Sequence, residues 1–346
     1  MYKKFLIVKL SSIGDVINAM PIARALKEEY ESAKISWLVS PPTDEILKFS
    51  PDIDEIILWD RRPFDEAVKN GNFFLAFKLL RDAKILFSKY EFDVILDVHS
   101  LFLTGILSRM IKAKERFGIE ELHEGNSFFM TKTVKNIVEI HKAKRYFSVL
   151  NLLNINPKFQ KPNINFDENL IKKAEDFLAK NNVDLSKKIL AINIKTTWEN
   201  KHYPFDSFVE VIKNIDENVE IIFTGTKGDI SVIESVQKKS ERGISIAGKT
   251  DISDLFYIFK RIDLLLTVDS GPLHIASLAN LKTVSLWGPT SPKMYAPLFG
   301  DNRFIVSPYS CAACNKRKCK KGDNLCIRAI EPKIVVDEVN KAMKEF

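Results

Sequence analysis

Side chains that could bind phosphate or sugar hydroxyls gather in four short loops of this chain. Each loop follows an apolar run, and the four segments are residues 11–15, 193–204, 223–229 and 267–279. An apolar run that leads through a polar loop into a helical pattern is typical of the carboxyl end of a parallel strand, where α/β sheets bind their ligands. These loops are therefore the first place to look for binding or catalytic chemistry.

The first loop reads Ser-Ser-Ile-Gly-Asp and separates an apolar run from a helical pattern. Gly14 permits tight backbone geometry, and Asp15 places a carboxylate near the start of the helix. A helix N-terminal cap explains the same residues, because Ser and Asp there stabilise a helix by about 1 kcal/mol. From the residues alone, a ligand contact and a cap are equally good explanations.

The second loop combines two hydroxyls with a cation. Thr196 and Thr197 follow the apolar run 189–194, and Lys201 comes four residues after Thr197. Hydroxyl groups and an ammonium together suit a phosphate group. The alternative is an ordinary loop with a solvated lysine, and this segment alone does not exclude it.

The third loop, Phe-Thr-Gly-Thr-Lys-Gly-Asp, has two glycines around a turn. Gly225 and Gly228 do not form the G-x-G-x-x-G pattern of dinucleotide-binding loops. Asp229 then opens a helical pattern, where its carboxylate could hold ribose hydroxyls. A helix cap explains Asp229 at least as well.

The fourth loop joins a carboxylate to a helix start. Asp269 ends an apolar run, and Ser270 and Gly271 lead into a helical pattern with Pro272 in its first turn. Pro suits that turn because its missing N–H costs nothing there, and the free N–H groups of a helix N-terminus favour phosphate. Asp269 is placed to bind sugar hydroxyls, whereas His274 taken alone is more typical of a packed helix residue.

The elements that carry these loops alternate between strand and helix. Strands are expected at residues 5–10, 35–39, 56–59, 94–98, 189–194, 219–223, 244–246, 264–268 and 283–286. Helical spacing falls at residues 17–26, 74–87, 101–111, 141–153, 171–178, 208–214, 230–239, 255–259, 273–281 and in the tail from 334. This alternation predicts α/β architecture: two doubly wound, Rossmann-like parallel sheets that face a cleft.

The best candidate for a linker is the stretch rich in Asn and Pro at residues 154–169. We therefore expect domains at residues 1–160 and 161–330, followed by a C-terminal helix at 331–346. Two domains are also the natural expectation for 346 residues.

The bulk composition limits the classes of partner and the location. A net charge of +7 suits an anionic substrate, a phospholipid surface or a nucleic acid without choosing among them. The chain has no apolar run of 18 residues, and its start lacks the pattern of a signal peptide. We therefore expect a cytoplasmic protein.

All four cysteines fall in one short segment, as Cys311, Cys314, Cys319 and Cys326. This clustering argues against a disulfide framework for the whole fold. Four thiolates in one loop could hold a structural zinc ion, although the spacing fits the usual paired C-x₂-C pattern only loosely. Free thiols and local disulfides are the alternatives.

Four stretches of the chain resemble glycosyltransferase family 9, the ADP-heptose:lipopolysaccharide heptosyltransferases. They are KFLIVKLSSIGDVINAMP, KTTWENKHYP, VDSGPLHIASLA and SLWGPTSPKMYAPL, and the resemblance runs from residue 3 to about residue 340. It implies the GT-B fold, with the acceptor bound by the N-terminal domain and the donor by the C-terminal domain. It also implies inversion of the anomeric carbon without a catalytic metal or other cofactor.

In the first half, the resemblance implies Asp15 as the general base on the acceptor hydroxyl. It places Ser12, Gly14 and the basic pair Arg61 and Arg62 on the anionic inner core of lipopolysaccharide. His141 matches a histidine at the head of a helix, for which we expect a structural role. Asn18 departs from the histidine that is usual at this position, which weakens assignment to a particular member of the family.

In the second half, the resemblance implies a site for ADP-heptose, with Lys201 and a helix N-terminus stabilising the leaving diphosphate. The residues implied for the donor are Thr196, Thr197, Lys201, Asp229, Thr250, Asp269, Ser270, Gly271 and His274. Asp229 is implied at the ribose, Thr250 at the adenine and Asp269 at the sugar.

Two alternatives remain open. One keeps the fold and uses a different nucleotide sugar. The other is a nucleic-acid-binding protein built on the basic charge and the cysteines, which predicts a basic face with interleaved aromatic side chains. Residues 314–323 carry the charge without an aromatic. We therefore expect no nucleic-acid partner, and leave open a peripheral contact with the anionic cytoplasmic face of the inner membrane.

Overall fold

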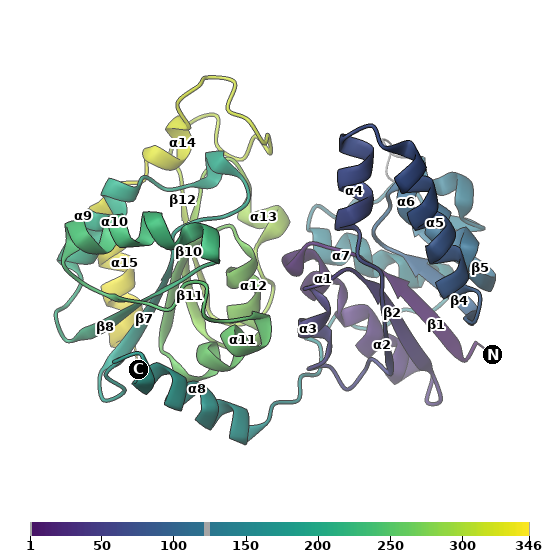
Figure 1. Ribbon diagram of the computed structural model, residues 1–346, viewed down its shortest axis with the longest axis horizontal. Helices are drawn as coiled ribbons and strands as arrows, with labels where there is room; N and C mark the ends of the chain where they lie inside the picture. The colour runs from purple at the N-terminus through teal and green to yellow at the C-terminus, as the bar shows by residue number, and fades with distance from the viewer. Residues whose placement is uncertain (1, 121–124, 346) are drawn as a thin grey trace. The chain divides into compact units, whose positions relative to one another are not determined.

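A computed structural model describes residues 2–120 and 125–345, and the chain divides into two compact units. The first unit ends at Asn165 and the second begins at Phe166. In each unit, helices lie on both faces of one sheet (Figure 1). The division falls inside the stretch rich in Asn and Pro. The end of that stretch stays with the first unit, because the Asn165 N–H donates to the Phe49 carbonyl (2.8 Å).

The sheet of the first unit has six parallel strands in the order β3, β2, β1, β4, β5, β6. Their bounds are β1 Lys4–Val8, β2 Lys34–Val39, β3 Glu55–Leu58, β4 Glu91–Asp97, β5 Lys112–Ile119 and β6 Lys132–Val134. The order reverses between β1 and β4. Ligands of open α/β sheets bind beyond the carboxyl ends of the strands at such a reversal. The loops after β1 and β4 are therefore the candidate site of the first unit.

Two of the helical patterns predicted for the first unit are divided in the structure. The helices of this unit are α1 Ile13–Ala19, α2 Pro21–Glu29, α3 Asp44–Leu47, α4 Arg62–Lys69, α5 Phe73–Phe87, α6 Phe102–Met110 and α7 Lys142–Phe147, with 3₁₀ turns at Asn126–Phe129 and Ser148–Leu153. The pattern at 17–26 splits at Pro21, which has no N–H to continue α1. The pattern at 141–153 begins as α7 and continues as a 3₁₀ helix.

The second unit repeats the same sheet. Its strands are β7 Lys188–Asn193, β8 Val219–Thr224, β9 Ile244–Ser245, β10 Leu264–Val268, β11 Lys282–Trp287 and β12 Asn302–Val306. They are parallel, in the order β12, β11, β10, β7, β8, β9, so the reversal lies between β7 and β10. The two doubly wound sheets confirm the predicted fold class.

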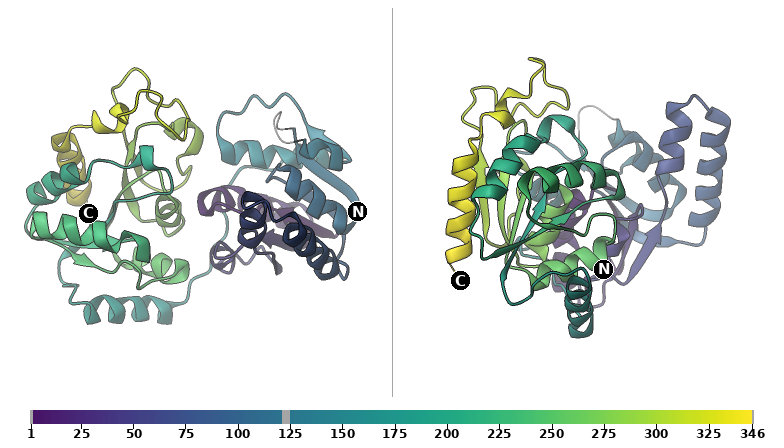
Figure 2. Two further views of the ribbon diagram at one scale, coloured as in Figure 1. Left: turned by 45° about the horizontal axis from the view of Figure 1, so that its top comes forward. Right: turned by 60° about the vertical axis from the view of Figure 1, so that its left-hand side comes forward.

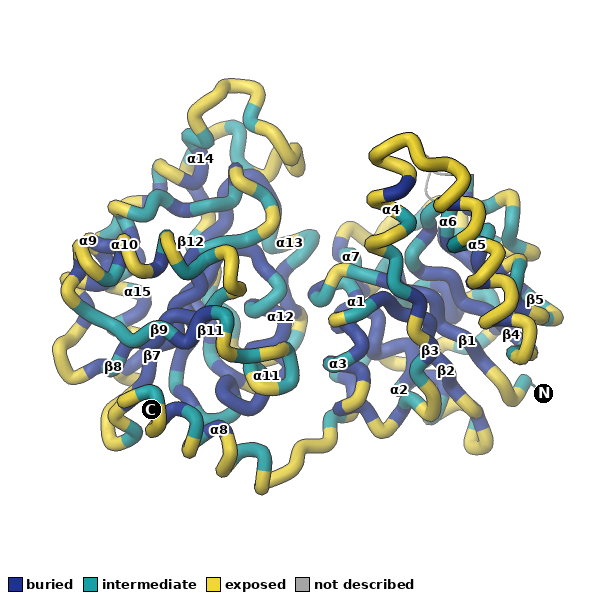
Figure 3. The backbone as a smooth tube through the Cα atoms, viewed as in Figure 1, coloured by how far each residue is buried: buried dark blue, intermediate teal, exposed yellow. Residues whose placement is uncertain are grey.

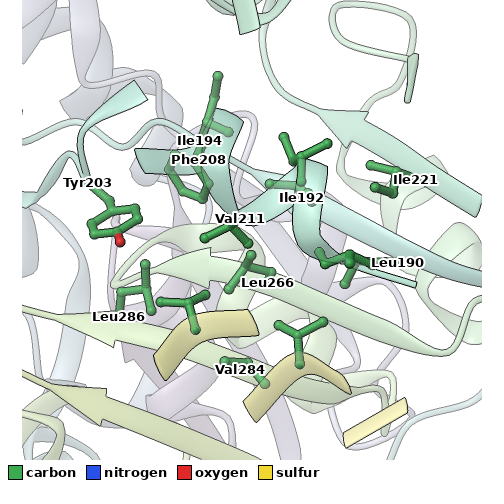
Figure 4. Packing of buried hydrophobic residues seen from close by; sticks show 14 of the residues in the cluster. Leu190, Ile192, Ile194, Tyr203, Phe208, Val211, Ile221, Leu266, Val284 and Leu286 are labelled. Atoms are coloured by element: carbon green, nitrogen blue, oxygen red, sulfur yellow. The ribbon is translucent and has the colours of Figure 1, made fainter. Parts of the chain in front are cut away.

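The helices of the second unit are α8 Glu168–Lys180, α9 Phe205–Asn214, α10 Ile230–Ser240, α11 Ile252–Arg261, α12 Gly271–Leu278, α13 Pro292–Tyr295, α14 Leu325–Arg328 and α15 Pro332–Lys344. Short 3₁₀ turns cover Glu199–Lys201 and Lys227–Asp229. The C-terminal helix α15 belongs to the core of this unit and is visible as the yellow helix in Figure 2. Its buried Val335 and Val339 belong to the same hydrophobic cluster as Phe208 and Val211 of α9 and Leu266 of β10. Figure 4 labels the last three of these side chains.

No helix in the described part of the chain combines the length and the apolar character that crossing a membrane requires.

Candidate active site

Asp15 uses its two carboxylate oxygens in different ways. It lies in the first turn of α1, after the buried Gly14, where Oδ2 accepts from the backbone N–H (3.4 Å) and the hydroxyl (3.1 Å) of Ser12. This half of the carboxylate makes the capping contacts that the sequence left open. The other oxygen, Oδ1, accepts from the hydroxyl of Tyr146 in α7 at 2.6 Å. A helix cap accounts for the contacts of Oδ2 but not for the hydrogen bond that Oδ1 accepts from Tyr146.

A buried lysine stands behind this contact. Lys9 is 4% exposed, and its ammonium donates to the Tyr146 hydroxyl (3.1 Å) and lies 4.3 Å from the centre of the Tyr146 ring. A buried cation is costly unless it is partnered, so the chain from Lys9 through Tyr146 to Asp15 is a connected unit. Sequence analysis missed both residues. Lys9 could have been noticed because it interrupts an apolar run, whereas no pattern in the sequence singles out Tyr146.

These neighbours decide the charge of Asp15. Burial raises the pKa of the carboxyl, but the charge of Lys9 and the hydrogen bonds from Tyr146 and Ser12 outweigh it and lower the pKa to about 2. Asp15 is consequently an ionised, partly buried carboxylate throughout the neutral range.

The loop after β4 brings a second group of side chains to the same sheet edge. Asp97 is fully buried and accepts from the backbone N–H groups of His99 (3.0 Å) and Ser100 (3.1 Å) and from the side-chain amide of Asn126 (2.9 Å). Burial raises the pKa of Asp97. The contacts of Asp97 with the N–H groups of His99 and Ser100 therefore fix the backbone of this loop.

His99 faces a cation. Its Nε2 lies 3.3 Å from Nη1 of Arg61, and burial together with the charges of Lys9 and Arg61 lowers the pKa of His99 well below its ordinary value. A neutral ring beside a guanidinium accepts through Nε2 and carries its proton on Nδ1. That buried Nδ1 has no hydrogen-bond partner among the described residues. The predicted basic pair is split, because Arg61 joins this group whereas Arg62 is exposed and pairs with Asp60 (2.6 Å).

In the second unit, the loops after β7 and β10 meet through an ion pair. The Lys201 ammonium lies 2.7 Å from Oδ2 of Asp269, and both side chains are nearly buried. The Thr196 hydroxyl donates to the Asp269 main-chain carbonyl (3.2 Å). The structure thus brings together three of the residues predicted for the donor, while Thr197 is exposed on the same loop.

The start of α12 lies beside this ion pair in the chain. Ser270 precedes Gly271, the first helical residue, and its hydroxyl lies 2.9 Å from that of Thr267 instead of capping the helix. The N–H groups of the first turn therefore receive no side-chain cap, which suits an anion. His274 is buried in this helix, as expected of a packed helix residue.

Asp229 forms a separate ion pair. Its Oδ1 lies 3.1 Å from the Lys195 ammonium, and its Oδ2 accepts from the N–H (2.7 Å) and hydroxyl (2.8 Å) of Thr226. The capping explanation therefore holds for one oxygen of Asp229. Thr250 is half-buried, on a segment that reaches this loop through the hydrogen bond from the Gly248 N–H to the Gly225 carbonyl (2.9 Å).

The segment with the cysteines contacts the loop that holds Lys201. Asn200 donates its side-chain amide to the Lys316 carbonyl (2.6 Å), and Trp198 has Lys201 and Arg317 within 4.2 and 5.4 Å of its ring centre. No pattern in the sequence indicates this contact.

The four thiols are free. No group of three or more His, Cys, Asp or Glu side chains is arranged to hold a metal ion within residues 2–120 and 125–345. Backbone hydrogen bonds, with that of Lys321 first, lower the pKa of Cys319. Burial raises the pKa of Cys326, and the neighbouring charges of the other three thiols add to this effect.

Comparison with known proteins identifies one family over most of the chain. The model described as "Glycosyltransferase family 9 (heptosyltransferase)" matches residues 84–324. The lipopolysaccharide core heptosyltransferase OpsX of Haemophilus influenzae is 25% identical over 313 residues, which cover 89% of this chain and 85% of that protein.

Two solved structures share the fold along nearly the whole chain. The family 9 glycosyltransferase of Veillonella parvula has a TM-score of 0.85 at 22% identity, covering 100% of this chain and 98% of its own. ADP-heptose lipopolysaccharide heptosyltransferase II of Escherichia coli has a TM-score of 0.78 at 17% identity, covering 99% of both chains. The architecture is therefore GT-B, as the resemblance implied.

Proposed function

Since the chain belongs to glycosyltransferase family 9 and is a glycosyltransferase, we propose that it transfers heptose from ADP-heptose to the inner core of lipopolysaccharide. The names of its relatives support both substrates. The observation that carries the mechanism is the pair of charged groups at the strand reversals of the two sheets. An ionised carboxylate, Asp15, follows β1, and a cation, Lys201, follows β7 beside Asp269 of β10.

The second unit supplies binding for an anionic leaving group. Departure of ADP places negative charge on a phosphate oxygen, and donors already aimed at that oxygen lower the barrier most. Lys201, the Thr196 hydroxyl and the uncapped N–H groups of α12 are such donors. A diphosphate competes with Asp269 for Lys201, which frees Asp269 to accept hydrogen bonds from sugar hydroxyls.

The first unit supplies the proton acceptor. The acceptor hydroxyl attacks the anomeric carbon opposite the departing diphosphate, so one C–O bond forms as the other breaks and the configuration inverts. With a pKa near 2, Asp15 is a weak base toward a free hydroxyl. It becomes an effective base once the attacking oxygen bonds to the electron-poor carbon and turns acidic. The proton then moves to Asp15.

Recognition of the acceptor falls to the loops after β3 and β4. Arg61 offers a guanidinium that suits the anionic groups of the inner core, and the His99 ring lies beside it. Both arginines hold a carboxylate, Arg62 that of Asp60 and Arg61 that of Asp65. We assign the acceptor contact to Arg61 because it is the one that lies beside His99.

A donor panel tests this proposal. The purified protein is given a heptose-deficient lipopolysaccharide with ADP-heptose, ADP-glucose or UDP-glucose, and nucleotide release and product mass are followed. We expect release of ADP and a heptose-sized increase with ADP-heptose alone. Turnover with another nucleotide sugar and none with ADP-heptose would overturn the donor assignment and support the alternative family 9 chemistry.

A further inference from the structure

The outer face of α5 exposes large apolar side chains to an unusual degree. Phe73, Phe74 and Phe77 are 71%, 83% and 70% exposed, and Ile85 is 66% exposed. Figure 3 shows the helix as an exposed ridge on the first unit. Single exposed apolar residues are common, but a contiguous apolar group marks an interaction surface.

The opposite face of α5 fixes its orientation. Ala76, Ala83 and Phe87 are buried, and the last two belong to the core that contains Leu6 and Ile95 of the sheet. With 3.6 residues per turn, Phe74, Lys78, Arg81, Asp82 and Ile85 lie on the side opposite this face, and the exposed Phe77 and Lys84 lie next to them on one flank; together they form the outer face. The exposed phenylalanines are therefore not a core face that the fold has left unpaired.

Cations alternate with the apolar residues on this outer face. Lys78, Arg81 and Lys84 are exposed, and the one acid of the helix, Asp82, lies 3.4 Å from Arg81. Burial of the phenylalanine rings away from water is favourable, and the long cationic side chains can extend to the side and stay in contact with headgroups. This combination suits the boundary between headgroups and acyl chains of an anionic bilayer. The positive charge of this face favours an anionic bilayer over the same face of a second copy of the chain, because the cations of the two copies would repel each other.

We propose that the outer face of α5 docks the protein on an anionic lipid bilayer. Phe74, Phe77 and Ile85 enter the boundary between headgroups and acyl chains, while Lys78, Arg81 and Lys84 contact anionic headgroups. The helix has 15 residues, about 22 Å, which lets the whole face lie along the membrane plane. This surface is independent of the sugar that is transferred, because docking needs no donor.

Vesicle sedimentation tests the proposal with the full chain and no substrate. Wild-type protein is expected to bind vesicles that contain phosphatidylglycerol at least tenfold more tightly than vesicles of phosphatidylcholine alone. Phe74→Ser/Phe77→Ser should lose at least tenfold of the binding to anionic vesicles. Lys78→Ala/Lys84→Ala should also weaken binding to anionic vesicles, and the loss should be largest at low salt, where the attraction between charges is least screened.

Matched controls separate this face from general effects. Ile334→Ser removes a half-exposed apolar residue on α15, and Lys172→Ala/Lys173→Ala removes two exposed charges on α8. Both should bind vesicles like wild type, and melting temperatures should show that all variants fold. If Phe74→Ser/Phe77→Ser fails to fold, vesicle binding by Lys78→Ala/Lys84→Ala still tests the proposal.

Three results would overturn the proposal. The first is equal binding by wild type and the folded α5 variants, or no binding to anionic vesicles at all. The second is a wild-type dimer, by sedimentation velocity, that the phenylalanine substitutions dissociate while vesicle binding is absent. The third is binding of a single-stranded oligonucleotide that depends on the same residues, again without vesicle binding.

Discussion

At the scale of single residues, the contact between Asp15 and Tyr146 carries most of the chemistry of the first unit. The 2.6 Å hydrogen bond, with Lys9 behind it, keeps Asp15 ionised despite its burial. Ionised groups held in this way are common where an enzyme must have one protonation state ready. The same contact links pH to stability, and this link can be tested without any substrate.

Replacing Tyr146 by Phe should move the acid sensitivity of the fold. Because the folded pKa of Asp15, about 2, lies below its ordinary value of 3.8, its ionisation stabilises the fold above the ordinary value, and this stabilisation is lost as pH falls toward 2. Without the hydroxyl the folded pKa rises, so Tyr146→Phe should be less stable than wild type at pH 5, and the difference should shrink toward pH 2. Urea unfolding between pH 2 and 6 measures it, with Tyr90→Phe as the control. Parallel curves for Tyr146→Phe and wild type would show that the bond does not set this pKa.

Removing the Lys201 cation should weaken the donor site. A hydrogen bond to a charged group contributes about 1.5–3 kcal/mol, so Lys201→Ala should lower ADP affinity about tenfold or more and slow turnover as well. Calorimetry with ADP measures the affinity, with Lys213→Ala on α9 as a control for loss of a surface charge. ADP affinity equal to wild type would remove Lys201 from the phosphate site.

At the scale of elements, the loop after β7 depends on a segment more than a hundred residues later in the chain. Asn200 is 4% exposed and donates to the Lys316 carbonyl, which ties the Lys201 loop to the segment with the cysteines. The segment with the cysteines therefore supports a loop of the candidate site. No local pattern in the sequence reports a contact of this range.

Loosening this brace should affect both stability and donor binding. Asn200→Ala removes the hydrogen bond to Lys316 and should cost about 1 kcal/mol of stability together with a several-fold loss of ADP affinity. Thermal unfolding and calorimetry give the two quantities. Asn214→Ala is the control, since the Asn214 amide donates to the Glu210 carbonyl of its own helix. A stability loss with unchanged ADP affinity would mean that the brace has no bearing on the site.

The predictable elements were those whose buried residues form a continuous run. Strands such as β1 and β7 were predicted for this reason, and so were the loops at their carboxyl ends. β5 was missed because its first half alternates exposed charges with partly buried residues, and β12 because it is a half-exposed edge strand. The partners of Asp15 were missed because Tyr146 is 131 residues away in sequence.

At the scale of the whole molecule, two sheets with the same strand order each hold one half of the chemistry. Counted from β3 in the first sheet and from β9 in the second, the strand order reverses after the third strand in both sheets. Each unit therefore has one pair of loops at its reversal, after β1 and β4 in the first unit and after β7 and β10 in the second. Every contact described for Lys201 and Asp269 lies in the second unit, and every contact of Asp15 lies in the first. Binding of the nucleotide and activation of the acceptor should therefore be separable by mutation.

The most direct test of this account is ADP affinity and heptose transfer measured on one variant, Asp15→Asn. Asn keeps the shape of Asp and can still accept from Ser12, but it cannot take up the proton of the acceptor hydroxyl. We expect normal folding, ADP affinity within twofold of wild type, and transfer reduced by about 10²–10⁴-fold. Asp176→Asn, an exposed change on α8, should leave both quantities unchanged. Transfer by Asp15→Asn within a few-fold of wild type would contradict the assignment of Asp15 as the base and leave it as a helix cap.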